Sequence, residues 1–165
     1  MTDKNVVAVK CTALSPAFLD RCQEIVDSLA ASYSAKIALV TQICDGGLTV
    51  RSASTNSENT FTAGDFIAFD NNLFCFRVID SGAPLYVDAS RSGSVTADDH
   101  ADLPIAYFGF PLRGASGELF GTLCMLEANP QQDVILVQAV IDKFKKIIER
   151  ELLVLGPLEQ SAEKS

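Results

Sequence analysis

Residues 107–130, YFGFPLRGASGELFGTLCMLEANP, decide the fold of this chain. The run YFGFPL is short, aromatic and apolar, and LFGTLCML is a second apolar run, so each predicts a buried strand. Between them, RGASGE supplies glycines and small polar residues for a tight reversal. Pro130 ends the second strand because proline has no amide hydrogen to donate. The stretch predicts a β-hairpin, and the few charges on its strands place it in the centre of a sheet, covered on both faces.

The segments on either side predict an α+β domain. Apolar residues recur at helical spacing over residues 16–34, where Ser15 can cap the helix and Pro16 can begin it, and again over residues 134–155. A shorter helix is expected to end near residue 80. The order of elements favours an antiparallel sheet of about five to six strands with the terminal helices on one face. Besides the hairpin, strands are expected at residues 36–44, 48–54 and 85–88.

Two motifs in the chain resemble those of GAF domains. The central hairpin is similar to the family pattern Y-x-G-x-P-L followed by G-T-L-C-x-L-D-x-x-P, although Glu127 stands where the pattern has aspartate. Residues 74–90, FCFRVIDSGAPLYVDAS, are similar to Y-C-x-x-V-x-x-x-G-x-P-L-x-V-x-D-A. The resemblance covers residues 16–155. The hairpin positions that match are Tyr107, Gly109, Pro111, Leu112, Gly121, Thr122, Leu123, Cys124, Leu126 and Pro130.

The resemblance implies a GAF/PAS-like fold with a ligand cavity on the face of the sheet opposite the terminal helices. In this family, ligands lie between the sheet, the helix that matches residues 70–80 and the loop that matches residues 89–103. We therefore expect residues 16–155 to form a GAF-like domain. Residues 1–15 are left unassigned, and residues 156–165 form a polar tail.

Length and charge exclude several classes of protein. A chain of 165 residues is about one domain, and nearly half of it is apolar, which is enough for one substantial core. The formal net charge of −8 argues against nucleic acid as a partner, because such proteins carry basic patches. No apolar run approaches the length of about 20 residues that spans a bilayer. We expect a cytoplasmic protein that binds neither nucleic acid nor membranes.

The sequence carries few residues for enzymatic chemistry. His100 is the only histidine, and neither a P-loop nor a dinucleotide-binding fingerprint is present, so no metal site and no catalytic residue is predicted. The odd number of cysteines and the lack of a C-x-x-C pair fit reduced thiols better than a disulfide framework. The cysteines are Cys11, Cys22, Cys44, Cys75 and Cys124.

Known GAF subgroups fit the chain poorly. Bilin-binding members attach the chromophore at a Cys-His pair, but here Phe76 follows Cys75. The signature of cyclic-nucleotide-binding members is absent. Members that reduce free methionine sulfoxide use several thiols in the middle of the domain, whereas Cys75 is the only cysteine between Cys44 and Cys124. The cofactor, if any, is unknown at this stage.

A set of apolar and aromatic residues forms the candidate binding site. In the middle helix, Phe74, Cys75 and Val78 share one face. In the hairpin, Phe108 and Phe110 share one strand face and Tyr107 lies on the other. Core packing is the simpler interpretation of each residue, and a small-molecule pocket under a lid at residues 89–102 is the functional one. The candidate ligand-binding residues are Phe74, Cys75, Val78, Asp88, Tyr107, Phe108, Phe110, Thr122 and Cys124.

The resemblance implies a non-catalytic sensory or regulatory domain that binds a small molecule in signal transduction. Residues 152–155, LLVL, are apolar on more sides than one face can bury, which predicts a homodimer through the terminal helices. A signalling output domain or protein is a possible further partner. One alternative is a thiol-based redox enzyme or sensor that uses Cys75 or Cys124. Another is a dimerisation scaffold with a vestigial pocket.

Overall fold

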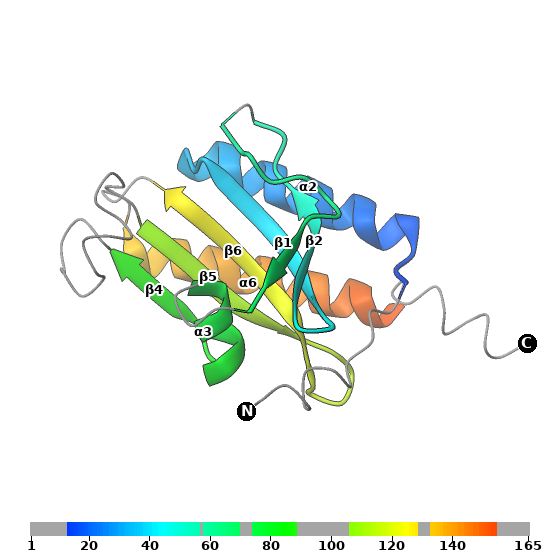
Figure 1. Ribbon diagram of the computed structural model, residues 1–165. Coiled ribbons are helices and arrows are strands. Elements are labelled where there is room, and N and C mark those ends of the chain that lie inside the picture. The colour runs from blue at the N-terminus through cyan, green and yellow to red at the C-terminus, as the bar shows by residue number, and fades with distance from the viewer. Residues whose placement is uncertain (1–12, 57, 70–73, 89–105, 129–132, 155–165) are drawn as a thin grey trace, which may run out of the picture.

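The computed structural model describes residues 13–56, 58–69, 74–88, 106–128 and 133–154. Six antiparallel strands form one sheet in the order β3-β2-β1-β6-β5-β4, and three helices pack against it (Figure 1). The elements are α2 (Pro16–Tyr33), β1 (Ile37–Cys44), β2 (Gly47–Ala53), β3 (Phe66–Ala68), α3 (Phe74–Ser81), β4 (Leu85–Asp88), β5 (Ala106–Arg113), β6 (Leu119–Ala128) and α6 (Val134–Val154).

The predicted hairpin lies at the centre of the sheet, as expected. Its second strand, β6, pairs with β5 on one side and with β1 on the other. The reversal between β5 and β6 is closed by backbone hydrogen bonds from Gly114 to Glu118 and from Gly117 to Gly114. Gly117 has a φ of 84°, which favours glycine. The α+β class and the antiparallel sheet are thus confirmed, with β3 as a further short strand at the edge.

Both long helices begin at a side-chain cap. The Phe18 amide donates to Ser15 Oγ at 3.2 Å, and Pro16 is the first helical residue, as the sequence predicts. At the start of α6, the Leu136 amide donates to Asp133 Oδ1 at 3.2 Å, a cap that was not predicted. None of the helices in the described part of the chain is both long and apolar enough to cross a membrane.

The two faces of the sheet are covered differently. Helices α2 and α6 lie side by side across one face, and α3 packs on the other face over β5 and β6 (Figure 1). The larger hydrophobic core fills the space between the sheet and the two long helices, and we call this side the helical face. We call the other side the α3 face. The expected lid, residues 1–12 of the N-terminal segment and the polar tail lie outside the described residues.

Candidate functional site

The α3 face carries the candidate site. Phe74 and Val78 of α3 are buried against the sheet, and Cys75 is half-buried beside them. A second hydrophobic cluster forms around these residues. The sheet contributes Ile37, Leu39, Val50, Ala53, Tyr107 and Cys124 to this cluster, and Phe61, Ile67, Leu85, Val87 and Leu126 pack at its border.

Two thiols and a phenol meet within this apolar cluster. The Sγ atoms of Cys75 and Cys124 are 3.4 Å apart, which brings α3 into contact with β6. The hydroxyl of Tyr107 on β5 donates to Cys75 Sγ at 3.2 Å. Cys124 and Tyr107 are fully buried. The helix α3 and the two strands of the central hairpin therefore place polar atoms at one point under α3.

Two buried threonines extend this polar centre across the sheet. Thr41 on β1 lies opposite Thr122 on β6, and their Oγ1 atoms are 2.7 Å apart. The Thr122 amide also donates to Thr41 Oγ1 at 3.2 Å. Both side chains are fully buried, so the pair satisfies hydroxyl groups that would be costly to bury alone. We call Thr41, Cys75, Tyr107, Thr122 and Cys124 the sulfur–hydroxyl cluster.

The position of Tyr107 depends on a neighbouring glycine. A Cβ atom on Gly109 would come within 2.3 Å of the Tyr107 hydroxyl and 2.7 Å of its ring. The phenol therefore lies along the strand over Gly109, in space that a larger residue would fill. Its ring also packs against Phe74, with centroids 5.0 Å apart at an interplanar angle of 44°. These contacts fix the phenol where it reaches Cys75.

The cluster shifts the pKa values of its members in opposite directions. Hydrogen bonds from Cys124, Tyr107 and Thr122 stabilise the Cys75 thiolate and lower the pKa of Cys75 despite burial. The hydrogen bond to Cys75 and burial raise the pKa of Cys124. Burial also raises the pKa of Tyr107, so its phenol stays protonated. On α2, burial and, to a smaller extent, the negative charge of Glu151 raise the pKa of Cys22 to about 12. Cys75 is therefore the thiol of the cluster that ionises first.

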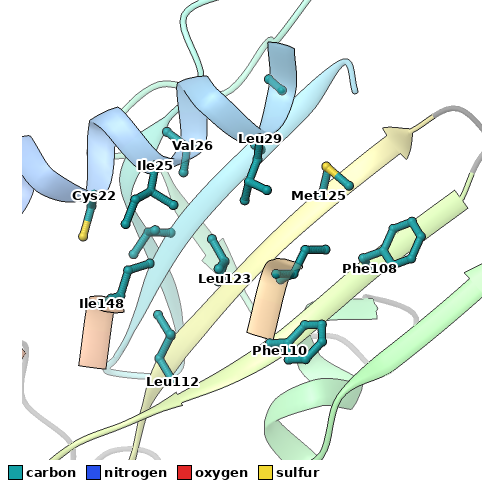
Figure 2. Close-up of a cluster of buried hydrophobic side chains, with 14 of the residues drawn as sticks. Cys22, Ile25, Val26, Leu29, Phe108, Phe110, Leu112, Leu123, Met125 and Ile148 are labelled. Atoms are coloured by element: carbon teal, nitrogen blue, oxygen red, sulfur yellow. The ribbon is translucent and has the colours of Figure 1, made fainter. Parts of the chain in front are cut away.

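Phe108 and Phe110 do not belong to this site, and their assignment to it was wrong. Both are buried in the core between the sheet and the long helices. Figure 2 shows their rings in the hydrophobic cluster that also contains Leu112, Leu123 and Met125. The physical reason is the two-residue period of a strand, which sends their side chains to the face opposite Tyr107.

Most of the other predicted site residues meet at one place. Phe74, Cys75, Val78, Tyr107 and Cys124 share the second hydrophobic cluster. Thr122 joins them through its hydroxyl, which supports the Cys75 thiolate. Asp88 lies in β4 opposite Ala106, and its side chain is outside the described set. Thr41 was missed, although a threonine inside an apolar strand is a signal of a buried polar contact.

Arg113 is a second residue that the sequence did not reveal. Its guanidinium donates to the carbonyl oxygen of Gly82, at the end of α3, at 2.9 Å, and to that of Gly117 at 2.8 Å. Its backbone amide donates to Glu149 Oε2 on α6 at 2.8 Å. The same carboxylate accepts from Lys145 Nζ at 2.6 Å. Arg113 thus joins the end of α3 to the last helix on the opposite face.

Among the residues that the structure describes, the cysteines and carboxylates outside the sulfur–hydroxyl cluster form no second centre. Cys22, Cys75 and Cys124 are free thiols, but Cys44 is disulfide-bonded, so the expectation of reduced thiols is wrong for Cys44. Among the described residues, no group of three or more histidine, cysteine or carboxylate side chains is placed to hold a metal ion.

A groove with a volume of about 230 Å³ lies between α2 and α6, bordered by Arg21, Glu24, Ile25, Ser28, Phe144, Ile147 and Glu151.

Comparison of the structure with known proteins identifies the fold. The GAF domain of a phosphoenolpyruvate-protein phosphotransferase from Coxiella burnetii is 16% identical, with a TM-score of 0.61 over 90% of this chain and 86% of the other. A free methionine-R-sulfoxide reductase from Neisseria meningitidis, in complex with its substrate, is 14% identical, with a TM-score of 0.60 over 90% and 81%. The phycocyanobilin-bound GAF domain of a cyanobacterial phytochrome is 14% identical, with a TM-score of 0.58 over 82% and 86%.

No protein-family model matches the sequence, and neither does any curated protein. At identities of 14–16%, the structural likeness establishes the fold alone. The chain has a GAF-like fold, which confirms the resemblance seen in its two motifs.

Proposed function

We propose that this chain is a non-catalytic sensory or regulatory domain that binds a small molecule on the α3 face and acts as a homodimer. The observation that carries this proposal is the sulfur–hydroxyl cluster under α3. Small-molecule sites combine apolar walls with a few polar groups that fix the orientation of the ligand. Phe74, Val78 and Leu39 are apolar residues buried on the α3 face, and Tyr107 and Thr122 carry buried hydroxyl groups there, so a ligand reaches them by displacing α3.

The proposed route for a signal runs through Arg113. A ligand that displaces α3 alters the hydrogen bond between the Arg113 guanidinium and the Gly82 carbonyl. The same residue holds Glu149 of α6 through its amide. A ligand moves such an equilibrium only by its differential affinity for the two arrangements. An output domain or partner protein that reads the position of α6 would receive this signal.

The proposed dimer uses α6. Leu136, Ile147 and Val154 are 60%, 42% and 73% exposed, and their spacing places them along one side of the helix. Leu153 is also exposed, whereas Leu152 is buried, so the expected apolar end of the helix is only partly covered. An apolar stripe of this kind fits the same stripe on a second copy, because a two-fold interface is self-complementary.

Sedimentation velocity at tens of micromolar tests the dimer. The parent protein is expected to sediment as a dimer, and Leu136→Glu combined with Val154→Glu as a monomer. Ala63→Glu, at an exposed loop position far along the chain from α6, is the matched control and should remain dimeric. A monomeric parent protein would eliminate this part of the proposal.

Thermal unfolding in the presence of candidate ligands tests the binding function. The candidates are nucleotides, amino acids, tetrapyrroles and aromatic acids, and one that binds the native state raises the melting temperature by mass action. Tyr107→Phe removes one hydroxyl from the α3 face and should reduce the shift. Tyr86→Phe is the matched control, because the Tyr86 ring packs against Phe108 on the helical face. An equal loss of the shift in both variants would place the ligand elsewhere.

Thiol-based redox chemistry is the second candidate function. It is favoured by the 3.4 Å separation of Cys75 and Cys124 and by the hydrogen bond from Tyr107 to Cys75. A thiolate stabilised in this way is the reactive form of cysteine. Alkylation kinetics at neutral pH test this candidate. It is eliminated if Cys75 reacts no faster than free cysteine.

A further inference from the structure

We infer that Cys75 and Cys124 form a reversible redox pair, in which a hydroperoxide oxidises the two thiols to a disulfide that fastens α3 to the central strand β6. The inference rests on the second candidate function and names its substrate class and its regulatory effect. It is independent of whether the α3 face also binds a ligand.

The first argument is geometric. The two sulfur atoms lie 3.4 Å apart, and a disulfide bond brings them to about 2.05 Å. A small movement of α3 toward the sheet is therefore enough to close the bond. The two residues are 49 positions apart in the chain and belong to different elements. The bond would thus join a peripheral helix to the centre of the sheet.

The second argument is the asymmetry of the two thiols. Cys75 is half-buried, whereas Cys124 is fully buried in β6, so an oxidant that reaches the pair meets Cys75 first. The Tyr107 hydroxyl donates to Cys75 Sγ at 3.2 Å. When Cys75 ionises, the neighbouring Cys124 thiol becomes a second donor to it. Cys75 is the attacking sulfur and Cys124 the resolving one.

The chemistry balances with a hydroperoxide as the only co-reactant. The Cys75 thiolate attacks the terminal oxygen of ROOH, the O–O bond breaks, and Cys75 becomes a sulfenic acid. The departing alkoxide takes up the proton that Cys75 released when it ionised, which gives ROH. Cys124 Sγ then attacks Cys75 Sγ, and the sulfenic hydroxyl leaves as water with the proton of Cys124. The sum is two thiols and ROOH converted to a disulfide, ROH and water.

The bond would change the α3 face. Oxidation consumes the thiol that accepts the Tyr107 hydrogen bond, and it replaces a non-covalent contact of α3 with a covalent one. Local opening of α3 from the sheet would then be suppressed. Because α3 forms one wall of the proposed binding site, the redox state of the pair would control access to that site.

The experiment uses the full chain, tert-butyl hydroperoxide as the oxidant, and peptide mass mapping. We expect two peptides joined by a Cys75–Cys124 disulfide. The mass of the joined pair should be two hydrogen atoms less than the summed mass of the two reduced peptides, and dithiothreitol should separate them. In Cys124→Ser, the resolving thiol is missing, so Cys75 sulfenic acid should be captured by dimedone. In Cys75→Ser, neither the disulfide-linked peptides nor a dimedone adduct should form. Amide hydrogen exchange of α3 should slow on oxidation of the parent protein and not in Cys124→Ser.

Cys22 serves as the internal reference. It is fully buried, and burial and Glu151 raise its pKa to about 12, so Cys75 should be alkylated at least about tenfold faster. The Cys22→Ala variant should form the Cys75–Cys124 link as the parent protein does. Rapid alkylation of Cys75 without the linked peptide overturns only the redox pair. Alkylation of Cys75 no faster than that of free cysteine overturns the second candidate function as well.

Discussion

The two faces of the central sheet have the same strands and opposite chemistry. On the helical face, the buried side chains that meet α2 and α6 are almost all hydrocarbon, with Phe108, Phe110 and Met125 among them. On the α3 face, the same strands β5 and β6 present Tyr107 and Cys124 beside the buried hydroxyl of Thr122. Alternation along a strand is what separates the two sets.

This difference separates stability from function. A hydrocarbon core without polar atoms is free to maximise packing, and it supplies most of the free energy of folding. A buried centre of hydroxyl and thiol groups costs desolvation, which its hydrogen bonds only offset. Such a centre is therefore better explained by a binding or redox role than by stability. Four tests probe this division, one on the helical face and three on the α3 face.

Phe108→Ala should have the largest effect on stability. It removes a fully buried ring from the helical face and leaves a cavity under α6, so we expect a loss of about 3–5 kcal/mol in the free energy of unfolding. Urea denaturation measures this loss. The alkylation rate of Cys75 under native conditions should not change, because its sulfur lies on the other face. A changed rate would show that the two faces are coupled.

Gly109→Ala should have the next largest effect, of about 1–3 kcal/mol, because a new methyl group overpacks the α3 face. The added Cβ would come within 2.3 Å of the Tyr107 hydroxyl, so the phenol must move away. We therefore expect both lower stability in urea and slower alkylation of Cys75. Gly109→Ala in the Tyr107→Leu background, which lacks the ring, should recover part of the loss. If stability is not recovered, the added methyl group clashes with atoms other than the Tyr107 ring.

The Thr41–Thr122 pair should show non-additive stability. Replacing one threonine with valine leaves the other hydroxyl buried without its partner, at a cost of about 1–3 kcal/mol. Replacing both with valine conserves the volume and removes both hydroxyl groups, so the double variant should lose less than the sum of the two single losses. The remaining loss comes from the Thr122 amide, which no longer has Thr41 Oγ1 as an acceptor. Urea denaturation of the parent, the two single variants and the double variant completes this double-mutant cycle. Additive losses would show that the two hydroxyls do not depend on each other.

Tyr107→Phe should have the smallest effect on stability, about 1 kcal/mol, because it removes one hydrogen bond and keeps the ring. The pKa of Cys75 should rise, since the phenol stabilises the thiolate. The pH dependence of alkylation measures this change, and the midpoint should move to higher pH. Tyr86→Phe, on the helical face, should leave the midpoint unchanged.

Local patterns in the sequence predicted most of the fold. Ser15 with Pro16 gave the start of α2, and the glycine-rich turn between β5 and β6 gave the central hairpin. These signals are local because each depends on hydrogen bonds or backbone angles within a few residues. The short strand β3 is three residues long and carried too little pattern to be distinguished from a loop.

The candidate site was predicted less well. The sequence separated Tyr107 from Phe108 and Phe110 by alternation, but both faces of these strands are buried and apolar, so alternation alone does not show which face meets the long helices. The contact between Thr41 and Thr122 spans 81 residues and depends on the register of β1 against β6. Arg113 likewise meets Gly82 across 31 residues. Such contacts follow from the tertiary arrangement and leave no local signal.

The shortness of the two outer strands limits how this protein can associate. The edge strands β3 and β4 have three and four residues, so each offers a foreign strand very little backbone to pair with. Beyond β3, the edge of β2 is paired with a loop, because the Val50 amide donates to the Asp65 carbonyl and the Val50 carbonyl accepts from the Gly64 amide. Aggregation by strand addition is therefore disfavoured at the edges that the structure describes.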